Sequence, residues 1–141
     1  ALIMSNDLEK ARFHEREAQR ALGRHFEMQA DKAVSQRDFA TALRGYTDAM
    51  HKFVFDDKEY QRIHKKMESN GVATYRQAQL LGRCYDHNDH SISAMQEKLR
   101  SYYNAIKLYR SIRCEKEAKS LEGRCSSLET EVDDALGKYD Y

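Results

Sequence analysis

Proline is absent from this 141-residue chain, and only 6 residues are glycine. Folds with many tight turns need both, because proline presets a turn dihedral and glycine adopts conformations that other residues avoid. A β-sandwich or an elaborate α/β fold is therefore disfavoured. The length suits one domain of ordinary size, or two very small helical units that share a core.

An excess of charge of either sign is also lacking. Lysine and arginine total 24 and aspartate and glutamate 23, mixed along the chain. Because a nucleic-acid-binding surface is strongly basic, we expect no nucleic-acid partner. No run approaches the roughly 20 apolar residues of a membrane-spanning helix, and no signal-peptide pattern is visible. We therefore expect membrane association to be indirect or peripheral.

Cysteines are few, and their odd number shows no disulfide-framework spacing: Cys84, Cys114 and Cys125. A reducing compartment, the cytoplasm, is the simpler interpretation. Serine-nucleophile motifs, glycine-rich phosphate loops and the paired metal-binding helix motif are missing as well. We therefore expect no catalytic residue, no metal ligand and no cofactor. The chain is expected not to be an enzyme.

One cluster of possible metal ligands tests that expectation. It consists of Cys84, Asp86, His87, Asp89 and His90. Cysteine and histidine bind zinc and other transition metals, so a small metal-dependent helical enzyme is one hypothesis. Residues three and six positions apart on a helix do not converge on a point, however, and the same segment is rich in turn and cap formers. A capped interhelical turn is the preferred interpretation.

What the sequence does contain is apolar residues at three- and four-residue spacing, which is typical of amphipathic helices. The expected first helix begins at Asn6, where Glu9 completes a capping-box-like pair, and ends before the pause at residues 36–38. The later helices are expected over residues 39–53, 57–85, 92–109 and 118–135. The expected fold is thus all-α, an antiparallel bundle of about five helices.

The breaks between these helices differ in strength. Asp38 and Asp56 are good N-caps, and the segment 86–91 is the clearest turn in the chain. The apolar stripe changes phase near residues 112–116, which favours a bend there. Across Asp56 the stripes are nearly in phase, so an uninterrupted helix is an alternative, while Asn70-Gly71 could kink or split the third helix.

Residues 39–50, with the sequence FATALRGYTDAM, have a specific spacing of large and small side chains. Small Ala42 and Ala49 allow close helix approach, while aromatic side chains fill the gaps beside them. The segment resembles the second helix of microtubule-interacting and trafficking (MIT) domains, and also the second helix of a tetratricopeptide hairpin. Residues 30–38 resemble the end of the MIT first helix, and residues 72–81 its third. Ala42 and Ala94, which match the tetratricopeptide pattern, are too far apart for that repeat of about 34 residues.

The MIT resemblance implies a three-helix unit over residues 5–86, with an additional helical hairpin over 87–138 packed on it. Residues 102–112 repeat the spacing of 39–50 weakly, so the hairpin could be a degenerate second unit, as in the tandem arrangement of some autophagy kinases. MIT domains bind tail motifs of membrane-remodelling (ESCRT-III) proteins beside their third helix, so the resemblance implies a scaffold for membrane trafficking or autophagy. Endosomes or autophagosomes are the compartments it suggests.

The expected partner-binding residues follow from that resemblance: Tyr75, Arg76, Gln79, Gly82 and Arg83. Gln79 stands where many MIT domains have an acidic residue that receives a basic motif. With Arg76 and Arg83 beside it, the groove would instead favour an acidic or amphipathic partner helix or tail peptide. The alternative is a self-associating coiled-coil or BAR-like membrane-shaping fragment, a homodimer suggested by the near-continuous stripe from Phe39 to Tyr85.

Overall fold

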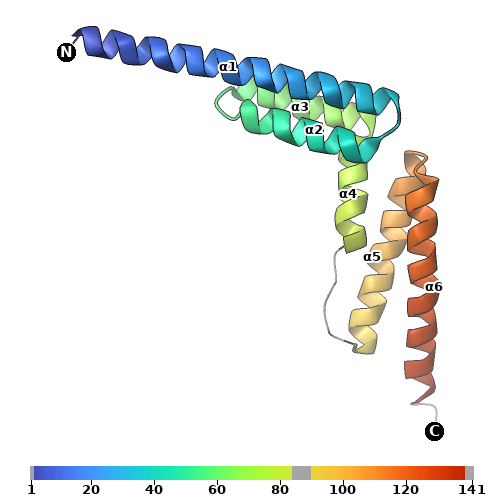
Figure 1. Cartoon of the computed structure of the whole chain (residues 1–141). Coiled ribbons are helices and arrows are strands. Elements are labelled where there is room, and N and C mark those ends of the chain that lie inside the picture. Colours follow the sequence, from blue (N-terminus) through green and yellow to red (C-terminus); the bar gives the residue numbers. More distant parts are fainter. Residues whose placement is uncertain (1, 84–89, 139–141) are drawn as a thin grey trace. The chain divides into compact units, whose positions relative to one another are not determined.

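The computed structural model describes residues 2–83 and 90–138, with side chains from residue 5, and this part of the chain is all-helical without a strand (Figure 1). The helices are α1 (Leu2–Ser35), α2 (Phe39–Lys52), α3 (Asp57–Asn70), α4 (Val72–Arg83), α5 (Ile92–Ser111) and α6 (Glu115–Gly137). The expected all-α class is confirmed, with six helices among the described residues in place of about five. The additional helix arises because the expected third helix is split at Gly71.

The chain divides into two compact units, Ala1–Val72 and Ala73–Tyr141. Almost all of α4 therefore groups with α5 and α6, whereas the sequence suggested a boundary at 86/87. The third helix of the first unit, beside α1 and α2, is α3. Residues 72–81, which were expected as the third helix of an MIT-like unit, form most of α4. Membership of the MIT family stays a prediction.

Small residues bring α1 and α2 together in the first unit. A β-carbon placed on Gly45 would lie only 2.9 Å from the β-carbon of Ala30, so the two helices approach as closely as glycine and alanine allow. Around this contact the side chains of Tyr46, Phe53 and Ile63 are fully buried. The alternation of small and large side chains in residues 39–50 is thus core packing, as its spacing predicted.

Local capping chemistry sets the ends of these helices. The Asp38 carboxylate accepts a hydrogen bond from the Thr41 backbone N–H at 3.2 Å, and Asp56 accepts one from the Glu59 N–H at 3.3 Å. Both predicted caps are therefore confirmed. The predicted cap at Asn6 is wrong, because Asn6 lies inside α1, which begins at Leu2.

A single rod from residue 39 to 85 is excluded by two interruptions. The chain leaves α2 after Lys52 and re-enters a helix only at Asp57. Gly71 then ends α3 with a φ of 89°, a left-handed conformation that glycine adopts without the steric penalty of other residues. The stripe on which the coiled-coil alternative rested is therefore distributed over three helices.

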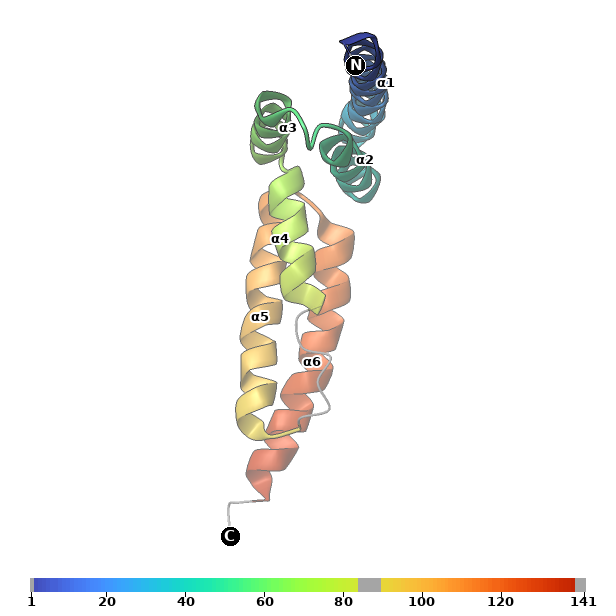
Figure 2. The ribbon, with the colours of Figure 1, turned by 90° about the vertical axis from the view of Figure 1, so that its left-hand side faces the viewer.

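The second unit is built on an α5–α6 hairpin with α4 packed against it (Figures 1 and 2). Residues 112–114 connect α5 and α6, so the bend predicted at 112–116 is confirmed. The rings of Tyr75 and Tyr109 meet edge to face, with their centroids 5.6 Å apart. The Ser101 hydroxyl donates to the Leu81 carbonyl oxygen at 3.1 Å, which ties α5 to the end of α4.

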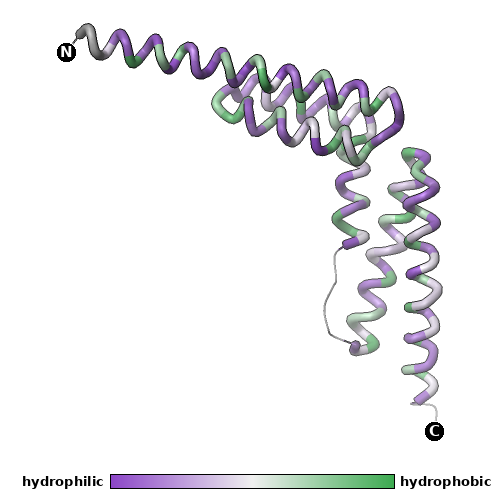
Figure 3. Tube along the Cα trace, viewed as in Figure 1, coloured by the Kyte–Doolittle hydropathy of each residue, from purple (hydrophilic) through white to green (hydrophobic). Residues whose placement is uncertain are grey.

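Hydrophobic and hydrophilic residues alternate along every helix in Figure 3. None of the described helices is both long enough and apolar enough to cross a bilayer. The amphipathic pattern instead matches helices that bury one side against a neighbour.

Candidate functional site

A groove between α4 and α6 contains three of the five predicted partner-binding residues. This α4–α6 groove has a volume of about 300 Å³. It is lined by Gln79, Gly82 and Arg83 of α4, Tyr109 of α5, and Lys116, Glu117, Ser120, Leu121 and Arg124 of α6. The structure therefore assembles the α4 half of the predicted site and adds an α6 half that sequence reasoning missed.

The other two predicted residues do not line this groove. Tyr75 is only 6% exposed and packs against Tyr109, so it is a core residue and is not presented to a partner. Arg76 is exposed, one helical turn before Gln79, and lies outside the groove lining. The predicted set therefore reduces to Gln79, Gly82 and Arg83 at the groove itself.

Gly82 creates the hollow in this groove. A β-carbon on Gly82 would stand 3.5 Å from both terminal methyl carbons of Leu121, which is ordinary van der Waals contact. An alanine would thus fit at position 82, whereas a longer side chain would extend into the space that the groove now leaves open. Leu121 forms the apolar floor opposite, because its side chain is buried in the α4–α5–α6 core.

Positive charge surrounds the hollow. Arg83, Lys116 and Arg124 line it, and none of the three makes a salt bridge with a described acidic side chain. Glu117 is the single carboxylate in the lining, so the groove carries two more positive than negative groups. Burial, with a contribution from Tyr75, raises the pKa of Tyr109 to about 12, which keeps its phenol neutral. An anionic side chain would therefore be attracted to the groove.

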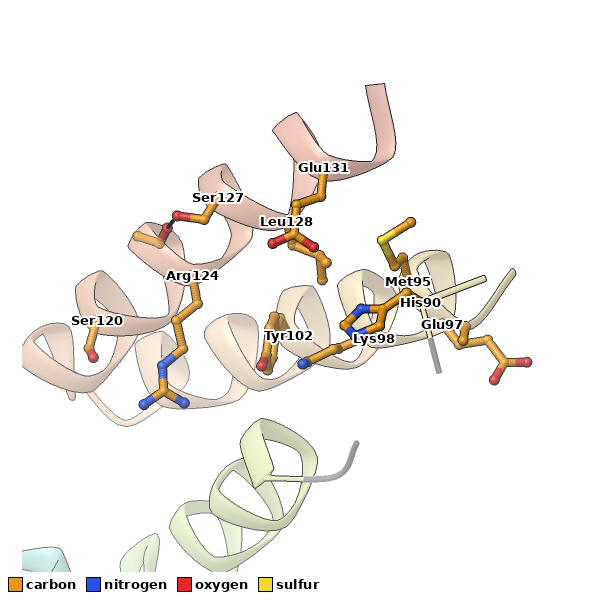
Figure 4. A pocket seen from close by; sticks show the side chains of 12 residues that line it. His90, Met95, Glu97, Lys98, Tyr102, Ser120, Arg124, Ser127, Leu128 and Glu131 are labelled. Atoms are coloured by element: carbon orange, nitrogen blue, oxygen red, sulfur yellow. Dashed lines mark hydrogen bonds between the residues drawn. The ribbon is translucent and has the colours of Figure 1, made fainter. Parts of the chain in front are cut away.

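A larger groove runs between α5 and α6 and is shown in Figure 4. This α5–α6 groove has a volume of about 1010 Å³. Its α5 side includes Met95, Lys98 and Tyr102, and its α6 side includes Ser120, Arg124, Ser127, Leu128 and Glu131. The Lys98 ammonium lies 5.9 Å from the centre of the Tyr102 ring, where the electron-rich face stabilises a cation.

The cluster of possible metal ligands falls mostly outside the described residues. Cys84, Asp86, His87 and Asp89 lie in the segment 84–89, and His90 is exposed and lines the α5–α6 groove. Within the part of the chain that the structure describes, no three histidine, cysteine or acidic side chains are grouped as a metal site requires.

A polar network around the buried Glu27 carboxylate and Tyr46 side chain in the first unit also escaped sequence reasoning. Both terminal guanidinium nitrogens of Arg62 donate to the Glu27 carboxylate at 2.6 Å, and Lys66 donates to the same carboxylate. Asp31 accepts a hydrogen bond of 2.5 Å from the Tyr46 hydroxyl, which in turn accepts one from the Asn70 amide at 3.0 Å. These hydrogen bonds connect α1, α2 and α3. Every buried side-chain polar atom in the described part has a partner.

The ionisation of this network favours a structural role. The hydrogen bond from Arg62 is the largest influence on the pKa of Glu27 and holds it below the usual 4.5, despite the opposing effect of burial. Burial and the hydrogen bond to Asp31 raise the pKa of Tyr46 well above its usual value. A general acid or base at neutral pH needs a pKa near 7, and neither group has one.

No protein-family model matches the chain, and no curated protein or solved structure is similar to it. The functional assignment therefore depends on the geometry and charge of the described grooves.

Proposed function

We propose that this chain is a non-catalytic protein-interaction module that binds an acidic, amphipathic helix or tail peptide of another protein. The α4–α6 groove is the binding site. The observation that carries the proposal is the apolar hollow at Gly82 and Leu121, flanked by Arg83, Lys116 and Arg124 without described carboxylate partners. On the MIT resemblance alone, the module would act in the cytoplasm as a scaffold for membrane trafficking or autophagy.

Charge and shape together define the ligand. An apolar side chain of the partner would enter the hollow beside Gly82, and acidic side chains next to it would approach the flanking cations. A basic peptide would instead meet three like charges at short range, which is unfavourable. Gln79 adds a neutral amide that can donate or accept a hydrogen bond at the edge of the groove.

The same geometry predicts a modest affinity. The floor residues Leu121 and Tyr109 are already buried, so a bound peptide removes little additional apolar surface from water. The surrounding charges are exposed, and an exposed ion pair contributes about 0.2–1 kcal/mol. We therefore expect dissociation constants in the micromolar range or weaker, rising steeply with salt.

Fluorescence anisotropy with the intact chain tests this function. The probe is a fluorescein-labelled helical peptide with one leucine flanked by glutamates, and its basic counterpart has lysines in place of the glutamates. Arg83→Glu and Arg124→Glu each replace an attraction by a repulsion and are expected to weaken binding of the acidic probe about three- to tenfold. Arg100→Glu is the matched control, because Arg100 is exposed on α5 and lines neither groove.

A second variant separates shape from charge. Gly82→Leu fills the hollow without altering any charge, and it should weaken binding of the acidic probe while circular dichroism shows an unchanged helix content. Gly82→Ala adds only one methyl group at contact distance and should weaken binding less. The proposal is wrong if the acidic probe fails to bind, or if Arg100→Glu lowers its affinity as much as Arg83→Glu does.

Self-association through α1 is a second candidate function. This helix has 34 residues and α2 and α3 have 14 each, so the first half of α1 extends beyond its neighbours (Figure 1). Leu8 and Phe13 lie on this extension and are each 58% exposed. Helices in proteins owe most of their stability to packing against a neighbour, so pairing of this extension with a second copy would stabilise it. Light scattering over a range of concentrations tests this, with Leu8→Lys expected to abolish any dimer.

A further inference from the structure

The two grooves of the second unit are joined along α6. Ser120 and Arg124 line both of them, so the two grooves meet at these residues. The α6 residues concerned recur at three- and four-residue steps from Lys116 to Glu131 and therefore share one side of the helix. At 1.5 Å per residue this side is roughly 22 Å long, the length of about four helical turns.

The length of α4 explains why, among the described residues, this side of α6 is only partly covered. With 12 residues α4 is much shorter than α5, which has 20, and α6, which has 23. Tyr75 packs near the α5–α6 connection, and α4 ends at Arg83. Beyond that point the two longer helices continue without α4 between them (Figure 2), and the α5–α6 groove lies there.

The charge changes sign along the joined grooves. At one end Arg83, Lys116 and Arg124 are positive. At the other end Glu131 lies beside Leu128 (Figure 4) and has no salt bridge with a described cation. Lys98 of α5 lines the same groove and lies over the Tyr102 ring. A ligand that spans both grooves thus meets positive charge first and negative charge last.

We propose that the bound segment is a single amphipathic helix of about four turns that lies along α6 across both grooves, with acidic side chains at Arg83, Lys116 and Arg124 and a basic side chain at Glu131. The inference rests on the proposed function and adds the length and charge order of the partner. Helices that pack at a shallow crossing angle stay in contact over several turns, which suits a ligand of this length. Only a segment with its charges in this order satisfies both ends of the joined grooves.

Three synthetic peptides test the proposal with the intact protein. The first has 16 residues, with glutamates in one half, lysines in the other and leucines at three- and four-residue steps. The second has the same composition with the charges interspersed. The third is the acidic half alone. We expect the first peptide to bind about three- to fivefold more tightly than either of the others, the effect of an exposed ion pair.

Charge reversal at Glu131 tests where the basic end of the bound peptide lies. Glu131→Lys should weaken the first peptide about three- to fivefold and leave the acidic half unchanged, because the acidic half does not reach that position. Asp133→Lys introduces the same charge change on the opposite side of α6 and should have no effect on either peptide. A first peptide with its lysines replaced by glutamates should recover affinity for Glu131→Lys.

The outcomes distinguish the two proposals. If the acidic half does not bind the unmodified chain, the proposed function is wrong, and so is the proposal of a ligand helix along α6. If the acidic half binds but the first peptide gains nothing over it, the proposed function stands and the longer ligand is wrong. Equal effects of Glu131→Lys and Asp133→Lys also overturn the charge order, because they show a response to net charge alone.

Discussion

The ring of Phe53 lies directly on the backbone of Gly23. A β-carbon at position 23 would come within 2.6 Å of the Phe53 Cζ atom, closer than such atoms approach in proteins. Phe53 is fully buried where α2 ends, and the absence of a side chain on α1 is what admits its ring. The contact therefore sets how closely the two helices pack at this end of the first unit.

Gly23→Ala should destabilise the protein for that reason. Overpacking against a buried ring costs about 1–3 kcal/mol, and the higher helix propensity of alanine offsets up to about 1 kcal/mol of it. Gly123→Ala is the matched control, because nothing lies within 4 Å of its added methyl group. It should stabilise α6 by up to about 1 kcal/mol. Urea unfolding followed by circular dichroism measures both, and a stabilising Gly23→Ala would contradict the packing described.

Glu27→Gln should lower the free energy of unfolding by about 1–3 kcal/mol, because it removes the charge that Arg62 and Lys66 hydrogen-bond. Glu68→Gln is the control, since Glu68 is exposed and its salt bridge is with His64, one turn away on the same helix. That change should stay within about 0.5 kcal/mol. Similar losses for both variants would show that the network contributes no more than a surface pair.

The Glu27 carboxylate should also make stability depend on acid pH. Its pKa is lower in the folded chain than the usual 4.5, chiefly through the hydrogen bond from Arg62, so the unfolded chain binds this proton at a higher pH. The contribution is therefore complete above pH 4.5 and is lost as the pH falls through the lower, folded pKa. Unfolding measured between pH 7 and pH 3 should show a shallower decline for Glu27→Gln than for the unmodified chain.

Gly71→Ala should destabilise the end of α3. The φ of 89° at this position is a left-handed conformation that costs an alanine about 1–2 kcal/mol. Gly71→Asn should cost less, because asparagine tolerates this region better than other non-glycine residues. Thermal unfolding should rank the three chains in the order glycine, asparagine, alanine. An alanine variant as stable as the parent would imply that α3 and α4 can form one continuous helix.

Cys114 and Cys125 should react slowly with iodoacetamide in the folded protein. Both are buried, and burial raises the pKa of the Cys125 thiol, so little thiolate is present at pH 8. Peptide mass spectrometry of samples labelled with and without urea should show labelling at least about tenfold slower in the native chain, since the thiols react only after local opening. Equal rates would show that these thiols are exposed in the native chain.

Interactions between residues close in the sequence predicted most helix ends well. The Asp38 and Asp56 caps depend on a side chain and a backbone N–H three residues away, so the sequence contains the whole interaction. The N-cap predicted at Asn6 was wrong, because a capping pair is also tolerated inside a helix that starts earlier. The sequence identified Asn70-Gly71 as an interruption of the third helix. It could not distinguish a kink from a complete break, since the same residue pair is compatible with both.

The candidate site was predicted only in part. Gln79, Gly82 and Arg83 were found because they lie on one helix, but Lys116 and Arg124 come from α6 and no local pattern connects them to α4. Tyr75 was assigned to the groove from the MIT resemblance, but its side chain is only 6% exposed. Its ring packs against Tyr109 instead.

By itself the sequence determined that this protein is helical, where most of its helices break and which side of each is apolar, because periodicity, caps and glycine act over a few neighbouring residues. Only the tertiary structure decided that α4 joins α5 and α6, that the buried Glu27 carboxylate meets two cations, and that Gly82 faces Leu121. Those choices depend on the fit between side chains far apart in the chain. Several pairings of amphipathic helices satisfy the same local pattern, and close packing selects one of them.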